Sequence, residues 1–207
     1  MEMNPMDIER RSMAIIESEL AVALPDEVKP IVMRVIHATA DFSFAESMYF
    51  SPGVVVLMRQ MMLGGATVVT DTQMALSGIN KRAAGVLGIS LRCFMSDDDV
   101  AAEAHQRGTT RALVSMERAI QLPGKKIMVC GNAPTFLMRL LADNNVMPNV
   151  PDVAVIGVPV GFVNVVESKQ VLRDSNLPVI IAMGRRGGSN VAAAIVNALM
   201  YGAGGRP

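Results

Sequence analysis

Five short apolar runs, each followed by a stretch with helical spacing, constrain most strongly what this chain can fold into. The runs are ATVVTD (66–71), ISLRCFM (89–95), KIMVCG (126–131), VAVIGVP (153–159) and PVIIAMG (178–184). Helical spacing follows at about 72–79, 97–121, 133–146, 161–174 and 188–201. Serial β–α units predict a parallel sheet built through right-handed crossovers. Because the runs are continuously apolar, helices are expected on both faces of the sheet.

The segment before these units predicts helices. It contains an Asn-Pro helix start near residue 4 and a run from Ser51-Pro52 to a double glycine at 64–65. No linker or repeat divides the chain. The sequence therefore predicts one α/β domain over 1–207, with an N-terminal helical segment (1–64) and β/α units (65–203). The fold class is three-layered, with a mostly parallel five-stranded sheet.

Charge and composition argue against nucleic-acid and membrane partners. Lys+Arg and Asp+Glu both number 19, and aromatic residues make up only 4% of the chain, so neither phosphate attraction nor base stacking is favoured. The apolar stretches 153–166 and 187–205 are interrupted by Gly, Pro or Asn and are not expected to span a membrane. Cys93 and Cys130 have no CxxC partner, which predicts reduced, buried thiols in a cytoplasmic protein.

The loops after the predicted strands are the expected place for a ligand, because open parallel sheets bind ligands at their carboxyl edge. Two of these loops, GNAPT (131–135) and GRRGGS (184–189), lead into helix starts whose backbone N–H groups can bind anions. Neither a dinucleotide-binding glycine motif nor a P-loop is present. Two histidines cannot build an ordinary His-rich metal site, and the aspartates at 97–99 are read as helix-capping residues. No metal is expected.

His37 is the strongest single catalytic candidate. Met33, Ile36 and Ala40 surround it at helical spacing, so the pattern taken alone favours a hydrogen-bonded core histidine. The competing interpretation is a buried proton donor. Arg111 read alone is an exposed helix charge, whereas the arginines and glycines of GRRGGS fit an anion site.

Taken in order, several motifs resemble those of the precorrin-8X methylmutases (precorrin isomerases) of cobalamin biosynthesis, including the cobalt-precorrin-8 enzymes. The resemblance covers nearly the whole chain. It is carried by IERRSMAII (8–16), IHATADFSF (36–44), FSP (50–52), TDTQMALSGI (70–79), GTTRA (108–112), GNAPT (131–135), GVPVGFVNVVESK (157–169) and GRRGGS (184–189).

The resemblance implies an isomerase that moves a methyl group from C-11 to C-12 of a corrin-type macrocycle, giving hydrogenobyrinic or cobyrinic acid. It implies no cofactor, and any cobalt arrives within the tetrapyrrole substrate. It also implies a homodimer with the pocket near the subunit interface. The sequence does not distinguish between the cobalt-free and the cobalt-containing substrate.

By the same resemblance, the catalytic histidine falls on His37, which would donate one proton to polarise the macrocycle. A general acid of this kind contributes about 10²–10⁴-fold. Ser12 and Arg111 fall on substrate contacts. The remaining contacts are expected from Gly131, Asn132 and Thr135 in one loop and from Arg185, Gly187, Gly188 and Ser189 in another.

Two further positions carry an alternative or a departure. Asp71, at a strand tip, is expected either to contact the substrate region or to cap the following helix. After Gly78 the family continues with a hydroxyl residue, an arginine and Leu-Pro, whereas this chain has Asn80 and Lys81 followed by RAAG. Asn80 is carried over as a substrate contact in the hydroxyl position.

Two other functions compete with the isomerase. One is a non-catalytic corrinoid-binding or carrier protein that uses the same pocket. The other is an α/β enzyme acting on a phosphorylated metabolite, which the missing phosphate-loop motifs disfavour.

Overall fold

Six strands form one sheet in the computed structural model, which describes residues 4–142 and 152–205. The strand order is β1-β6-β5-β4-β2-β3, and each neighbouring pair is parallel except β1 and β6. The mostly parallel sheet is confirmed, whereas the predicted number of five strands is wrong. The strands are β1 (Met48–Phe50), β2 (Thr67–Thr70), β3 (Ser90–Arg92), β4 (Lys126–Cys130), β5 (Val153–Gly157) and β6 (Val179–Ala182).

The additional strand, β1, lies within the segment predicted to be helical. It pairs antiparallel with β6, with Met48 opposite Ala182 and Phe50 opposite Ile180. Its three residues are all half-buried. Three residues are too few to show an alternation of apolar and polar side chains, and the partner strand lies far along the chain. The local sequence therefore does not predict this strand.

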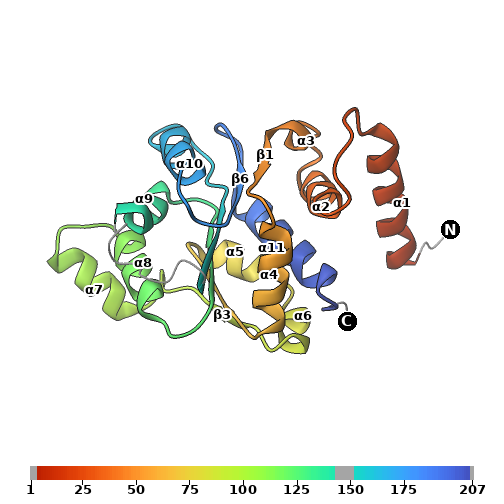
Figure 1. Ribbon diagram of the computed structural model, residues 1–207. Helices are drawn as coiled ribbons and strands as arrows, with labels where there is room; N and C mark the ends of the chain where they lie inside the picture. Colours follow the sequence, from red (N-terminus) through yellow and green to blue (C-terminus); the bar gives the residue numbers. More distant parts are fainter. Residues whose placement is uncertain (1–3, 143–151, 206–207) are drawn as a thin grey trace.

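Helices cover both faces of the sheet, as predicted (Figure 1). One face carries α2 (Lys29–Thr39), α4 (Val54–Leu63), α5 (Gln73–Gly78), α6 (Lys81–Val86) and α11 (Ser189–Gly202). The other carries α7 (Asp98–Gln106), α8 (Arg111–Gln121), α9 (Pro134–Ala142) and α10 (Val165–Arg173). The first helix, α1 (Pro5–Glu19), packs on the outside of α2, and the short α3 (Phe44–Ser47) leads into β1.

The observed helices differ from the prediction in two places. The stretch predicted as one helix over 97–121 is divided into α7 and α8, because Gly108 takes a φ of 59° that glycine adopts without strain. The short helix α6 was not predicted. The end of the predicted helix 133–146 falls partly outside the described residues, since 143–151 are not described.

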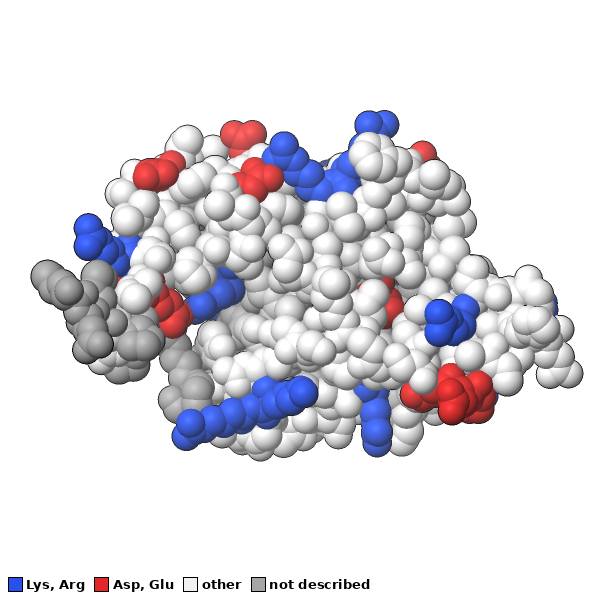
Figure 2. Space-filling model, turned by 180° about the vertical axis from the view of Figure 1, so that it is seen from behind, with Lys and Arg blue, Asp and Glu red and all other residues white. Residues whose placement is uncertain are grey.

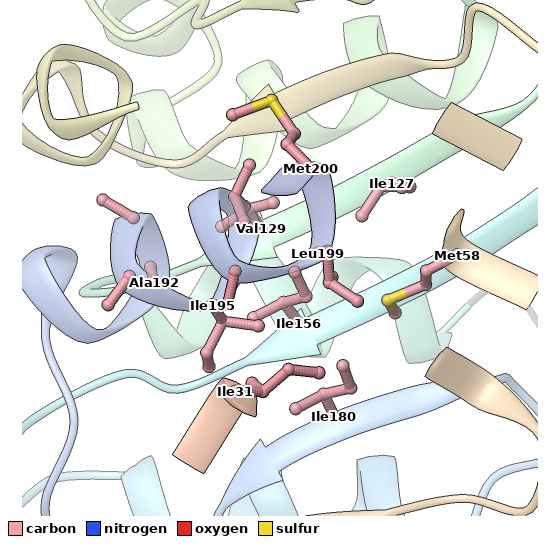
Figure 3. Close-up of a cluster of buried hydrophobic side chains, with 14 of the residues drawn as sticks. Ile31, Met58, Ile127, Val129, Ile156, Ile180, Ala192, Ile195, Leu199 and Met200 are labelled. Carbon is pink, nitrogen blue, oxygen red and sulfur yellow. The ribbon is translucent and has the colours of Figure 1, made fainter. Parts of the chain in front are cut away.

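The central helix of the fold is α11, which is buried along most of its length (Figure 3). Ile195 and Leu199 pack toward Val129, Ile156 and Ile180 of the sheet, and neither helix residue is exposed. A helix that is apolar on nearly all sides belongs in the interior. Its first residue, Ser189, follows the loop after β6, so the core fixes the position of the candidate anion loop.

The described residues form no helix that is both long and apolar enough to cross a membrane. Both cysteines are free thiols. Cys130 is buried as predicted, but the prediction for Cys93 is wrong, because that residue is partly exposed.

Candidate functional site

The loops at the carboxyl edge of the sheet are joined by a buried carboxylate, that of Asp71. Its Oδ1 accepts the backbone N–H of Gly131 (2.9 Å), and its Oδ2 accepts those of Asn132 and Ala133 (both 2.7 Å). Burial raises the pKa of this carboxyl, and the three N–H donors oppose the rise. The end of β2 thereby holds the loop that follows β4.

This arrangement corrects the predicted roles of Asp71. The side chain is fully buried and its oxygens face the protein, so it presents no carboxylate to a ligand. The alternative that it caps the next helix is also wrong: Thr72 is the N-cap of α5, and its Oγ1 accepts the N–H of Ala75.

The backbone amides of Gly131 and Asn132 were expected to bind substrate carboxylates. Both N–H groups are instead donated to Asp71, so they are not free for an anion. The Asn132 side chain is exposed, and Thr135 is half-buried in the first turn of α9. Contact with the substrate through these two side chains stays a prediction.

Hydrogen bonds also hold the loop after β6 to neighbouring parts of the carboxyl edge. The N–H of Gly188 donates to the carbonyl of Val158 (2.9 Å), so the amide of Gly188 is satisfied internally. A Cβ at Gly187 would lie 2.1 Å from the same oxygen, which explains the glycine there. Ser189 is buried, and its hydroxyl shares a hydrogen bond with Thr72 (2.8 Å).

The two arginines of this loop face outward. Arg186 donates to Asp41 (2.6 Å) and to the hydroxyl of Ser43. Together, the Ser43 hydroxyl and Arg186 lower the pKa of Asp41. The guanidinium of Arg185 lies 5.4 Å from the ring centre of Phe162, an aromatic residue that is 80% exposed. Arg186 was missing from the predicted contacts, although it adjoins Arg185 in the same motif.

His37 is exposed in the last turn of α2. The interpretation as a core histidine is therefore wrong, and the expected burial of the alternative proton donor is wrong as well. Its position places it four residues before Asp41, to which Arg186 binds. The structure thus brings the end of the histidine helix and the GRRGGS loop together.

Asn80 connects to the same helix through Tyr201, whereas the hydroxyl of Ser12 is bonded within α1. Asn80 caps α6 through its Oδ1 and donates to the hydroxyl of Tyr201 (3.0 Å). The Tyr201 ring lies under the guanidinium of Arg34, one turn before His37. Ser12 lies in α1, where its hydroxyl donates to the carbonyl of Ile8 (2.9 Å). The polar groups of Asn80 are thus already engaged within the fold.

Arg111 lies apart from this group. It is the exposed first residue of α8, and it donates weakly to the carbonyl of Met95 (3.4 Å), just after β3. Because β3 and β6 are four strand spacings apart, these two strands lie roughly 19 Å from one another across the sheet, and Arg111 and Arg186 are at opposite sides of the edge.

A second buried charge was not predicted. Lys169 in α10 is fully buried, and its Nζ donates to the carbonyls of Gly184 and Arg186, both at 2.8 Å. Burial lowers the pKa of this ammonium group to about 8. In addition, the described part of the chain contains no cluster of three or more His, Cys, Asp or Glu residues able to hold a metal ion.

We expect Asp71→Asn to destabilise the protein by about 3 kcal/mol, because the new NH₂ group would face backbone donors and leave at least one of them unpaired. The measurement is urea-induced unfolding. Asp174→Asn, at an exposed helix end, is the matched control and should change the free energy of unfolding by less than about 0.5 kcal/mol. Equal effects of the two substitutions would contradict the anchoring role.

The depressed pKa of Lys169 sets a pH dependence of stability. Between about pH 8 and the ordinary lysine value of 10.5, the unfolded chain binds more protons than the folded one, so the free energy of unfolding rises with pH. Across this window, we expect the unchanged protein to gain about 2–3 kcal/mol relative to Lys169→Met. Chemical denaturation of both proteins at several pH values measures this difference, and parallel curves would contradict the burial of a titrating amine.

Comparison with known proteins agrees with this architecture. A model of the precorrin-8X methylmutase family matches residues 7–202. The cobalt-precorrin-8 methylmutase of Salmonella typhimurium is 43% identical over 204 residues, which cover 95% of each chain. The precorrin-8X methylmutase of Pseudomonas aeruginosa is 36% identical over 195 residues, 93% of each chain.

A solved structure gives the same result. The precorrin-8X methyl mutase of Thermus thermophilus superposes with a TM-score of 0.86 at 32% identity, covering 95% of this chain and 97% of its own. The alignments extend over the N-terminal helices as well as the sheet. This chain therefore belongs to the precorrin-8X methylmutase family.

Proposed function

We propose that this protein is the isomerase that moves a methyl group from C-11 to C-12 of precorrin-8X or cobalt-precorrin-8 in cobalamin biosynthesis. Family membership over nearly the whole chain supports the reaction. The observation that carries the catalytic assignment is that His37 is exposed in the last turn of α2, four residues before Asp41, which binds Arg186 of the arginine loop. No resident cofactor is required, and cobalt, where present, belongs to the substrate.

In this proposal, His37 donates a proton to the macrocycle while the methyl group migrates and takes a proton back afterwards, so that the product is an isomer of the substrate and the imidazole is restored. Migration within a conjugated ring needs polarisation of the π-system and no nucleophile, so one acid suffices. The remaining rate acceleration comes from holding the ring in place.

Substrate carboxylates are bound by outward-facing guanidinium groups rather than by loop amides. Arg185 and Arg186 follow β6, on the side of the edge where Arg186 binds Asp41, and Arg111 lies beyond β3, four strand positions away. Arginine binds carboxylates through two parallel hydrogen bonds. Widely spaced arginines suit a broad ligand that carries acidic side chains on its rim.

We also propose that the working form is a homodimer in the cytoplasm, whose second copy shields His37. Exposed apolar side chains on α1 support this: Ile8 is 51% and Ile15 is 47% exposed. Figure 2 shows uncharged side chains across the middle of one face, with charged groups mostly toward its rim. Sedimentation equilibrium should give twice the chain mass of 22.1 kDa, and a monomer at catalytic concentrations would contradict the dimer.

The decisive variant is His37→Ala. We expect a loss of turnover of about 10²–10⁴-fold with product binding retained, because the proton donor is lost while the arginines remain. Absorption spectra after addition of precorrin-8X and of its cobalt form follow the conversion. His105→Ala removes the only other histidine, which is also exposed in the last turn of a helix, and should leave turnover unchanged.

Other outcomes would favour the competing functions. Full turnover in His37→Ala would remove the proposed mechanism. Binding of the precursor by the unchanged protein without any spectral change over time would favour a corrinoid carrier. Tight binding of a sugar phosphate, with no binding of corrinoids, would favour an enzyme of phosphorylated metabolites.

A further inference from the structure

Lys169 is a buried amine whose partners are backbone carbonyls. Its Nζ lies 2.8 Å from the carbonyl oxygens of Gly184 and of Arg186. Among the described residues, no carboxylate forms an ion pair with it, and the nearest titratable group that affects it is the buried Cys130 thiol. An apolar side chain here would avoid the cost of burying a charge but would leave both carbonyls without this donor. The amine is therefore tied to the conformation of the loop that it binds.

The two carbonyls that Lys169 binds flank Arg185 in the chain. Because both point inward to one nitrogen atom, residues 184–186 wrap around the ammonium group while the side chains of Arg185 and Arg186 stay exposed. The next residue, Gly187, is pressed against the end of β5, where a Cβ would meet the Val158 oxygen at 2.1 Å. The loop therefore has little freedom to carry its guanidinium groups elsewhere.

We propose that Lys169 is the positioning residue of the substrate's carboxylate site, because its ammonium group holds the loop that aims Arg185 and Arg186 at the tetrapyrrole. This inference rests on the proposed function. The ammonium group binds the backbone of the same loop that carries the two arginines, so its positive charge adds to the potential that attracts a polyacidic ligand. Lys169 itself does not touch the substrate.

The chain offers a matched control in Lys126, the first residue of β4. This lysine is only 7% exposed, and its Nζ also donates to two loop carbonyls, those of Leu122 and Gly124. Lys126 lies at the amino edge of the sheet, away from the arginine loop. Both lysines are buried and donate to two carbonyls, but only Lys169 lies beside the arginine loop. A comparison of their variants therefore distinguishes positioning of the site from general stabilisation of the fold.

The test compares Lys169→Met and Lys126→Met by titrating each with the coloured products, hydrogenobyrinic acid and cobyrinic acid. We expect Lys169→Met to weaken product binding at least tenfold and to raise KM by a similar factor, with kcat at saturation changed less than threefold. Lys126→Met should bind within twofold of the unchanged protein. In an Arg185→Ala/Arg186→Ala background, Lys169→Met should weaken binding by less than twofold further.

Several results would overturn the proposal. Unchanged binding by Lys169→Met would do so, as would an equal loss in Lys126→Met or the same tenfold loss in the arginine-free background. Lys169→Gln, which keeps two N–H donors without the charge, is made in parallel in case the methionine variant does not fold, and it is scored by the same criteria. Failure of the unchanged protein to bind either product would instead contradict the proposed function.

Discussion

Two buried charges that bind backbone groups organise the carboxyl edge of this sheet. The Asp71 carboxylate accepts three N–H groups from the loop after β4, and the Lys169 ammonium donates to two carbonyls of the loop after β6. Helices cover both faces of the sheet, so the backbone groups where these loops leave the strands are buried. Buried N–H and carbonyl groups need hydrogen-bond partners within the protein. Residues distant in sequence supply those partners.

The internal pairing of these backbone groups limits which groups at the edge are free to bind a ligand. Backbone amides that parallel α/β proteins often offer to anions are already used internally, at Gly131, Asn132 and Gly188. In the proposed function, the substrate is therefore recognised by side chains that project from the fixed loops, above all the guanidinium groups of Arg185 and Arg186. The loops serve as a rigid base, and the end of α2, which carries His37, leads to Asp41, which binds Arg186 of that base.

The sequence predicts the sheet and helix layers well, because continuous apolar runs and helical spacing are local signals. It does not show β1, whose three residues gain their strand character from pairing with β6. Nor does it show that Asp71 faces inward, since the amides that it binds lie some 60 residues later. For His37, apolar neighbours indicated burial, but the last turn of α2 extends beyond the core. Nothing in the local sequence separates Lys169 from an exposed lysine.

The central claim, that His37 meets the tetrapyrrole, has a direct measurement because the chain contains only two histidines. In protein carrying ¹⁵N-labelled histidine, two sets of imidazole resonances are expected, and His105→Ala assigns them. Addition of hydrogenobyrinic acid should shift the His37 resonances and leave those of His105 in place. Product binding that leaves the His37 resonances unmoved would contradict the account.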